Sequence, residues 1–202
     1  MAPTLKIGQK IEEFQVQEYC KTYGVNNAES YIVTDKKGRT AIMKIIIDGC
    51  SSVEFADSTR KLMKRMYSMP KLISYGIVNI DSIDYRFMVR ELSDGIRLSE
   101  FLKDGSVYSW DEAVIIMQQV LCALGVMHTR GIIHNDVTPR NVIVDVYDAT
   151  LVGFGHLSSE SSGGRARFKM NDLNPWYMAP ETMRHRFNVR SDIFSAGALM
   201  YT

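Results

Sequence analysis

The chain has 202 residues and a formal net charge of +1, with 46% hydrophobic and 23% charged residues. This length can bury one or two cores, and the composition is ordinary for a globular protein. A charge so close to zero offers no general attraction for nucleic acid or an anionic membrane surface, so neither partner is expected. The apolar runs are too short to span a bilayer, and Met1–Thr4 does not open a secretory signal.

Three cysteines, Cys20, Cys50 and Cys122, are widely spaced and include no C-x-x-C pair. An odd number of scattered cysteines favours reduced thiols over a disulfide framework. Reduced thiols are typical of an intracellular setting, so a cytoplasmic or nuclear location is expected.

The first part of the chain favours strands. Residues 31–34 and 40–46 are β-branched and apolar, and they flank the polar, Gly-containing turn Asp35–Arg39, a pattern that predicts a hairpin. Residues 52–66 have apolar side chains in rough helical register and predict a helix. Residues 85–90 alternate in polarity and predict a further strand.

After Gly95 the pattern becomes helical. Ser109 and Glu112 have the spacing of a capping box, which predicts a helix that starts at Trp110. Gly131 is expected to end this helix in a left-handed conformation. The expected buried face carries apolar side chains at three- and four-residue spacing: Val114, Met117, Leu121, Leu124 and His128.

The remaining segments are short. Residues 141–144 and 150–152 predict two strands around a turn, and the Ser/Gly-rich residues 158–164 predict a mobile loop. A last apolar helix is expected from near Asp192 to Thr202. A strand-rich part followed by a helix-rich part predicts a two-lobed α+β arrangement. The lobes are expected at residues 1–92 and 93–202.

One motif carries chemistry. His134, Asp136 and Asn141 have the spacing H-x-D-x-x-x-x-N of a phosphoryl-transfer catalytic loop. The triplet Gly153–Gly155 follows, where the corresponding pattern has Asp-Phe-Gly. The chain therefore keeps the position of the catalytic base, Asp136, and has no side chain at the position of the main magnesium ligand.

Five segments together resemble the protein kinase superfamily, in the order in which that family has them: Ala41–Lys44, His134–Asn141, Gly153–Gly155, Pro175–Glu181 and Asp192–Gly197. The resemblance implies a bilobal α+β protein-kinase-like fold with a hinge near Glu91–Gly95. Residues 69–71 and 85–88 are similar to the vaccinia-related branch, whereas Ala179–Glu181 is closer to conventional kinases.

The resemblance also implies roles for individual residues. Asp136 would orient the acceptor hydroxyl and Asn141 would hold a metal ion, while His134 would pack as a structural residue of the loop. Gly24, Lys44, Glu54 and Glu91 would bind the cofactor ATP. Glu54 would be the acidic partner of Lys44, with Asp57 as an alternative.

Several departures weaken the expected ATP and magnesium chemistry. Gly153 replaces the metal-binding Asp, and Thr138 replaces the lysine that serine/threonine kinases place in this loop. Asp145 and Asp148 are the nearest acids in the sequence, but a hairpin should aim them away from the site.

The nucleotide loop is also degraded. It keeps Gly24 and places Glu29 where a third glycine is expected, and an anion there would repel phosphate. By the same alignment, Arg90 occupies the back of the adenine pocket.

The first hypothesis is a pseudokinase that binds a protein partner, either a kinase or a kinase substrate. The second is an active, atypical serine/threonine protein kinase, supported by Lys44, Asp136 and Asn141. A third, a small-molecule kinase of the aminoglycoside type, is disfavoured by residues 175–181, which resemble a peptide-substrate loop.

The resemblance raises two further expectations. The second lobe would be incomplete, either as a natural truncation or because the sequence is a fragment. Ile193, Phe194, Leu199, Met200 and Tyr201 would then present apolar surface. Phosphate on Ser158, Ser159, Ser161 or Ser162 would pair with Arg165 or Arg167.

Overall fold

The computed structural model describes residues 3–20, 28–46, 68–146, 148–154, 156–159 and 173–202. The chain divides into two compact units, with a boundary after Leu92. Ser68–Pro70 is grouped with the second unit, where the Ser68 carbonyl accepts a hydrogen bond from the Leu151 amide at 3.0 Å. The division into lobes at 1–92 and 93–202 stays a prediction. The expected helix at 52–66 lies outside the described residues.

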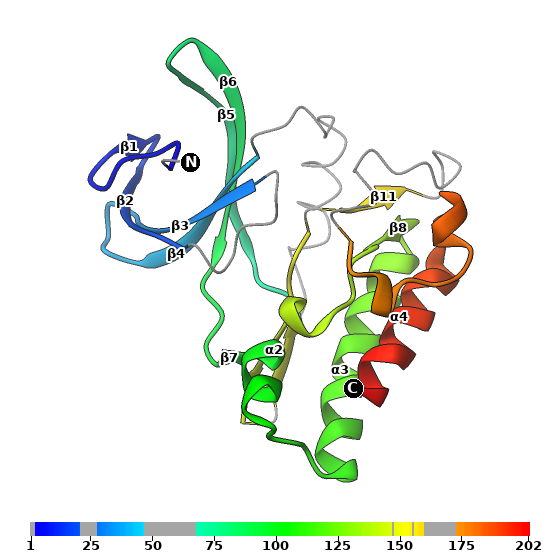
Figure 1. Cartoon of the computed structure of the whole chain (residues 1–202). Coiled ribbons are helices and arrows are strands. Elements are labelled where there is room, and N and C mark those ends of the chain that lie inside the picture. The colour runs from blue at the N-terminus through cyan, green and yellow to red at the C-terminus, as the bar shows by residue number, and fades with distance from the viewer. Residues whose placement is uncertain (1–2, 21–27, 47–67, 147, 155, 160–172) are drawn as a thin grey trace. The chain divides into compact units, whose positions relative to one another are not determined.

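The first unit is a six-stranded antiparallel sheet in the order β1-β2-β3-β4-β6-β5 (Figure 1). Its strands are β1 (Lys10–Ile11), β2 (Phe14–Tyr19), β3 (Ala28–Thr34), β4 (Thr40–Ile46), β5 (Leu72–Ile80) and β6 (Ile83–Glu91). The predicted hairpin is β3–β4, and the predicted strand at 85–90 lies within β6. Asp35 forms the turn because its Oδ1 accepts hydrogen bonds from the amides of Lys37 and Arg39, at 2.8 and 2.9 Å.

One face of this sheet is buried by the segment that precedes it. Tyr31, Met43 and Val89 come from three different strands and are fully buried in one cluster. Leu5 and Phe14 belong to the same cluster. Because side chains alternate along a strand, Lys44 lies on the other face of β4 from Met43.

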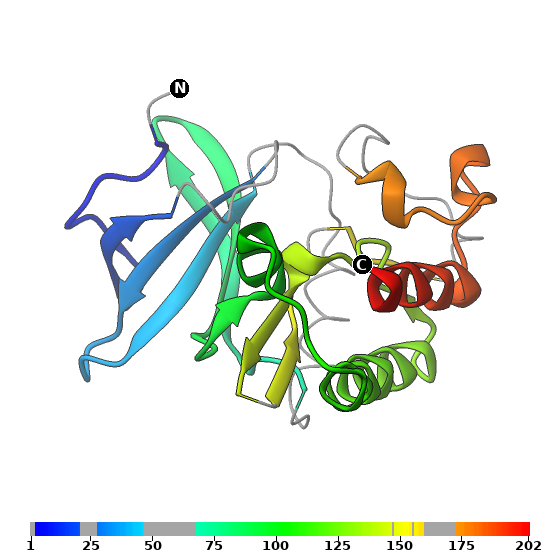
Figure 2. The same cartoon turned by 60° about the horizontal axis from the view of Figure 1, so that its bottom comes forward.

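The second unit is built around two helices that lie side by side, α3 (Trp110–His128) and α4 (Val189–Tyr201) (Figure 2). Two small antiparallel sheets accompany them, in the orders β10-β9-β7 and β11-β8. The remaining elements are β7 (Ile96–Arg97), α2 (Leu98–Phe101), β8 (Ile132–Ile133), β9 (Val142–Asp145), β10 (Asp148–Leu151), β11 (Ser158–Ser159) and the 3-10 helices η2 (Leu102–Asp104), η3 (Pro139–Asn141), η6 (Pro175–Tyr177) and η7 (Thr182–Arg184).

Helix α3 starts where the sequence predicts. The Glu112 amide donates to Ser109 Oγ, and the Ser109 amide donates to Glu112 Oε2 at 2.8 Å. Gly131 follows the helix with a φ of 68°. The predicted buried face is partly wrong, because Leu121 is 42% exposed. The buried face carries Ile116, Met117, Val120, Ala123, Leu124 and Met127.

Helix α3 is also the one described helix whose length and hydropathy would allow it to cross a membrane. Its buried face packs against α4 and β10, as the core helix of a globular unit does, so this property alone is weak support for a membrane span.

Helix α4 begins three residues before Asp192 because Asn188 caps it, accepting a hydrogen bond from the Arg190 amide at 2.8 Å. The expected apolar surface is present in part. Ile193 and Phe194 are about half exposed, but Leu199 is 4% exposed and belongs to the core.

Candidate functional site

The catalytic loop is fastened to α4 by one carboxylate. Asp192 is buried, and its two oxygens accept hydrogen bonds from the amides of His134 and Asn135, both at 2.8 Å. Asp192 Oδ2 also lies 2.9 Å from His128 Nε2 on α3. Asn135 adopts a φ of 66°. The loop between β8 and η3 is therefore held by Asp192 of α4, and His128 of α3 contacts the same carboxylate.

His134 is a structural residue of this loop. It is fully buried, its Nε2 donates to the Val152 carbonyl at 2.9 Å, and its Nδ1 accepts from the Asp136 amide at 3.2 Å. Its ring also meets Phe154 edge-on, with the ring centres 5.7 Å apart. Burial lowers the pKa of His134 and outweighs the opposing effect of Asp192 and Asp136. The imidazole is therefore held neutral.

The two carboxylate oxygens of Asp136 differ in their hydrogen bonds. The side chain is 4% exposed, and its Oδ2 accepts from Asn141 Nδ2 at 2.7 Å. His156 Nδ1 lies 3.3 Å from the same oxygen. Asp136 Oδ1 is buried without a hydrogen-bond partner among the described residues.

The Asn141 side chain lies where a side chain at position 153 would begin. Gly153 has a φ of 90°, which L side chains rarely adopt. A Cβ atom on Gly153 would lie 2.2 Å from both Cγ and Oδ1 of Asn141. The place where a metal-binding carboxylate would begin is therefore filled by the Asn141 amide.

The described residues do not fit a divalent cation in this arrangement. Asn141 Nδ2 donates to both the carbonyl and the carboxylate of Asp136, each at 2.7 Å. Asp145 and Asp148 are exposed and face each other at the far end of the β9–β10 hairpin. No cluster of three His, Cys, Asp or Glu side chains in the described ranges could hold a metal.

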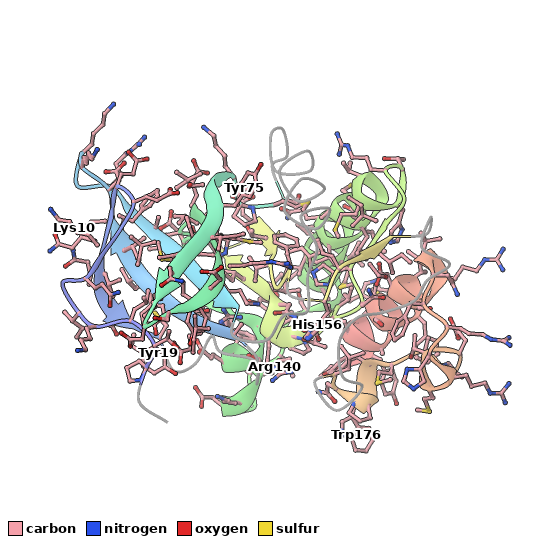
Figure 3. All side chains as sticks on the ribbon, turned by 90° about the horizontal axis from the view of Figure 1, so that it is seen from above. Lys10, Tyr19, Tyr75, Arg140, His156 and Trp176 are labelled. Carbon is pink, nitrogen blue, oxygen red and sulfur yellow. The ribbon has the colours of Figure 1, made fainter. Side chains whose placement is uncertain are left out.

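His156 is a site residue that sequence reasoning missed. It is buried beside Asp136, near the middle of its unit (Figure 3). The Asn135 side chain donates to the His156 carbonyl at 2.7 Å and to Ser158 Oγ at 2.8 Å. In the sequence, only its place directly after Gly155 marks His156, and the H-x-D-x-x-x-x-N motif gives that position no role.

The same contacts bear on the Ser/Gly-rich loop. Ser158 and Ser159 form β11 and pair with β8, so the start of this segment is a strand rather than the expected mobile loop. The other serines and both arginines of the expected phosphate pairing, Arg165 and Arg167, lie outside the described residues.

A small hollow with a volume of about 10 Å³, roughly the space of one water molecule, adjoins the catalytic loop and is partly open to solvent. Asp136 and Thr138 line one side, and Asn174 and Tyr177 of the η6 segment line another. Thr138 Oγ1 is buried without a hydrogen-bond partner in the described part of the chain. Three polar oxygens, one each from Asn135, Asp136 and Thr138, are thus left unpaired among the described residues that line this pocket.

The residues expected to bind nucleotide belong to the first unit. Lys44 is half-buried on β4, where it pairs in register with Ser30 and Met88. The backbone carbonyl of Glu91 accepts a hydrogen bond from Arg90 Nη1 at 2.9 Å. Gly24 and Glu54, like Asp57, lie outside the described residues.

The predicted repulsion between Glu29 and phosphate is wrong. The Glu29 carboxylate is buried, accepts a hydrogen bond from the Thr4 amide at 2.8 Å and also bonds the Tyr31 hydroxyl. Glu29 alternates with Ser30, which pairs with Lys44, so Glu29 and Lys44 lie on opposite faces of the sheet. Burial and the neighbouring Glu29 raise the pKa of Tyr31, which keeps its hydroxyl protonated.

A strand-rich unit and a helical unit with an H-x-D-x-x-x-x-N loop define a kinase-like class of protein. A family model described as the protein kinase domain matches residues 26–202. The chain belongs to the protein kinase domain family.

Known kinases match the chain over part of their length. The chain is 33% identical over 126 residues to calcium-dependent protein kinase 6 of Plasmodium berghei, which covers 60% of this chain and 8% of that protein. It is 27% identical over 149 residues to the probable serine/threonine-protein kinase PknB of Lactococcus lactis, covering 70% and 23%. CDPK-related kinase 3 of Arabidopsis thaliana is 30% identical over 148 residues, covering 70% and 24%. The chain thus spans less than a quarter of the length of each of these relatives.

Proposed function

We propose that this chain is a pseudokinase domain that binds a protein partner, a kinase or a kinase substrate, and transfers phosphate from ATP weakly or not at all. The observation that carries the proposal is the contact between Gly153 and Asn141. Gly153 has no carboxylate, and the Asn141 side chain fills the space in which the expected carboxylate would begin.

The expected loss of rate is large. Metal ions contribute several kcal/mol to phosphoryl transfer by neutralising developing charge. If the missing carboxylate accounts for about 4 kcal/mol of that, transfer slows by about a thousandfold. Thr138 adds to the deficit, because a neutral hydroxyl replaces a cation that would stabilise the transferring phosphate.

Nucleotide binding is expected to be weak as well. The resemblance places Glu91 beside the adenine, yet its carbonyl oxygen already accepts a hydrogen bond from Arg90. An adenine amine would have to share that oxygen with a guanidinium group. ATP therefore gains less at this position than it would from an open carbonyl.

The alternative is an active, atypical serine/threonine protein kinase. Asp136 Oδ1 favours it, since this buried oxygen is unpaired among the described residues and could accept the proton-bearing hydroxyl of a substrate. Lys44 and Asn141 are also retained.

One experiment separates the two functions. Purified chain is incubated with labelled ATP, a mixed serine/threonine protein acceptor and either Mg²⁺ or Mn²⁺, beside the Asp136→Asn variant as a matched control. The pseudokinase proposal expects equal, background incorporation from both proteins and no magnesium-dependent rise in melting temperature with ATP. Turnover that Asp136→Asn abolishes would establish the alternative instead.

A further inference from the structure

The segment between Glu181 and Asp192 contains three arginines and no acidic residue. Arg184, Arg186 and Arg190 are all exposed, and Met183 beside them is 60% exposed. No hydrogen bond or ion pair within the described part of the chain engages the three guanidinium groups. These four residues are called the arginine surface below.

Glu181 holds the backbone of this surface together. Its carbonyl oxygen accepts hydrogen bonds from the amides of Arg184 and Arg186, at 3.0 and 3.2 Å. The two amide nitrogens are therefore about 6 Å apart at most. Between them His185 adopts a φ of 56°, which tightens the turn.

Arg190 is held near Glu181 through the next residue in the chain, Ser191. Ser191 Oγ on α4 donates to Glu181 Oε1 at 2.9 Å, and Arg190 directly precedes Ser191. Ser195, one helical turn further on, donates to the Tyr177 carbonyl at 2.6 Å. The turn that carries Arg184 and Arg186 is thus fixed to a rigid helix, so little order has to be gained on binding.

The two acids that flank this surface, Glu181 and Asp192, already accept hydrogen bonds from other groups. Asp192 is 1% exposed and accepts hydrogen bonds from the catalytic loop. The carboxylate of Glu181 is half-buried and bonds Ser191. Neither acid pairs with an arginine, so no acid among the described residues neutralises the three guanidinium groups. Anions from another molecule can bind such groups.

We propose that the arginine surface binds an acidic peptide segment, rich in Asp and Glu, of a partner protein. Guanidinium groups bind carboxylates through two parallel hydrogen bonds, and exposed Met183 gives an apolar contact that a peptide side chain can cover. A polypeptide suits this mixed surface better than nucleic acid, because the net charge of the chain is only +1. The inference rests on the proposed function in taking the partner to be a protein.

The test measures binding of a fluorescent Asp/Glu-rich peptide that contains no Ser, Thr or Tyr, so the result is independent of any phosphoryl transfer. Reversing the three charges (R184E/R186E/R190E) should lower the affinity at least about tenfold, by the loss of three charge pairs. The matched control K10E/K36E/K37E reverses three exposed lysines of the first unit and should leave the affinity within about twofold.

Circular dichroism establishes that both triple variants are folded. Binding should weaken as salt rises and vanish when Asn and Gln replace Asp and Glu in the peptide. The inference is wrong if the acidic peptide does not bind at low salt, if both triple variants lose affinity equally, or if the neutral peptide binds as well. It is also wrong if a phosphopeptide or a single-stranded oligonucleotide binds the same surface more than tenfold tighter, since the partner would then be of another class.

Discussion

Gly153 illustrates how one position can change the chemistry of a loop. In sequence it is only a missing carboxylate. In the structure its lack of a Cβ lets the Asn141 amide pack against the backbone and hydrogen-bond to Asp136. Simply restoring Asp at 153 would therefore not restore a metal site, because Asn141 would have to move and the backbone would have to leave a φ of 90°.

This contact predicts coupling between the two positions. Gly153→Ala should destabilise the protein by about 2–4 kcal/mol, from backbone strain and overlap with Asn141. In an Asn141→Ala background the overlap is gone and only the strain remains, so the same change should cost at least about 1 kcal/mol less. Urea unfolding of the four proteins in this cycle measures the difference. Additive effects would mean that Asn141 moves aside at no cost and does not block position 153.

The residues of the H-x-D-x-x-x-x-N motif show the same difference between what the sequence predicts and what the structure adds. The spacing of His134, Asp136 and Asn141 was enough to place them in one loop, because they lie within eight residues of one another. The partnership of Asp136 with His156 could not be read in this way, since it depends on how a later segment returns to the loop. Glu29 was misjudged for a similar reason: the face of a strand that is buried depends on what covers it.

Helices and strands were predictable where local signals were strong. The β3–β4 hairpin followed from the Asp35 turn, and α3 followed from its capping box. The buried face of α3 was harder to predict because the helix carries apolar side chains on more than one face. Two neighbouring rows of these side chains therefore fitted the three- and four-residue spacing of a buried face. Packing against α4 and β10 selected the row with Val120 and excluded Leu121.

The capping box gives a prediction for α3. Ser109→Ala removes the Oγ that accepts from the Glu112 amide and should destabilise the protein by about 1 kcal/mol. Ser106→Ala, three residues earlier in the loop, is the matched control and should change the stability by less than about 0.5 kcal/mol. Thermal and urea unfolding provide the measurement. Equal effects of the two changes would show that the cap contributes nothing.

For the whole chain, the buried network around Asp192 connects α3, α4 and the catalytic loop. Stability and the geometry of the site therefore depend on the same groups. His134 belongs to this network as a neutral imidazole, because its Nδ1 accepts a hydrogen bond and its Nε2 donates one. A proton added to Nδ1 would meet the Asp136 amide hydrogen.

The neutral state of His134 predicts a loss of stability in acid. Its pKa is lowered in the folded protein, so the unfolded chain takes up a proton first as the pH falls. The contribution of neutral His134 to the free energy of unfolding is complete above the pKa of about 6.5 that histidine has in the unfolded chain. Below that pH it declines, by up to about 1.4 kcal/mol per pH unit, until the pKa of the folded protein is reached.

Urea unfolding between about pH 7.5 and pH 5.5 tests this dependence. His134→Gln should be less stable at neutral pH but should show a flatter pH dependence than the parent protein. His185→Asn, at an exposed position with a positive φ that Asn tolerates, should keep the parent's dependence. If His134→Gln loses as much stability in acid as the parent, another group is responsible.

The sequence by itself determined the kinase class, the hairpin, the capping box of α3 and the absence of a side chain at 153. These features depend on residues close together in the chain, where spacing fixes geometry. Only the tertiary structure decided that Asn141 fills the place of the missing carboxylate and that Glu29 faces the core. Each of these depends on segments distant in sequence, whose contacts are set by packing rather than by local pattern.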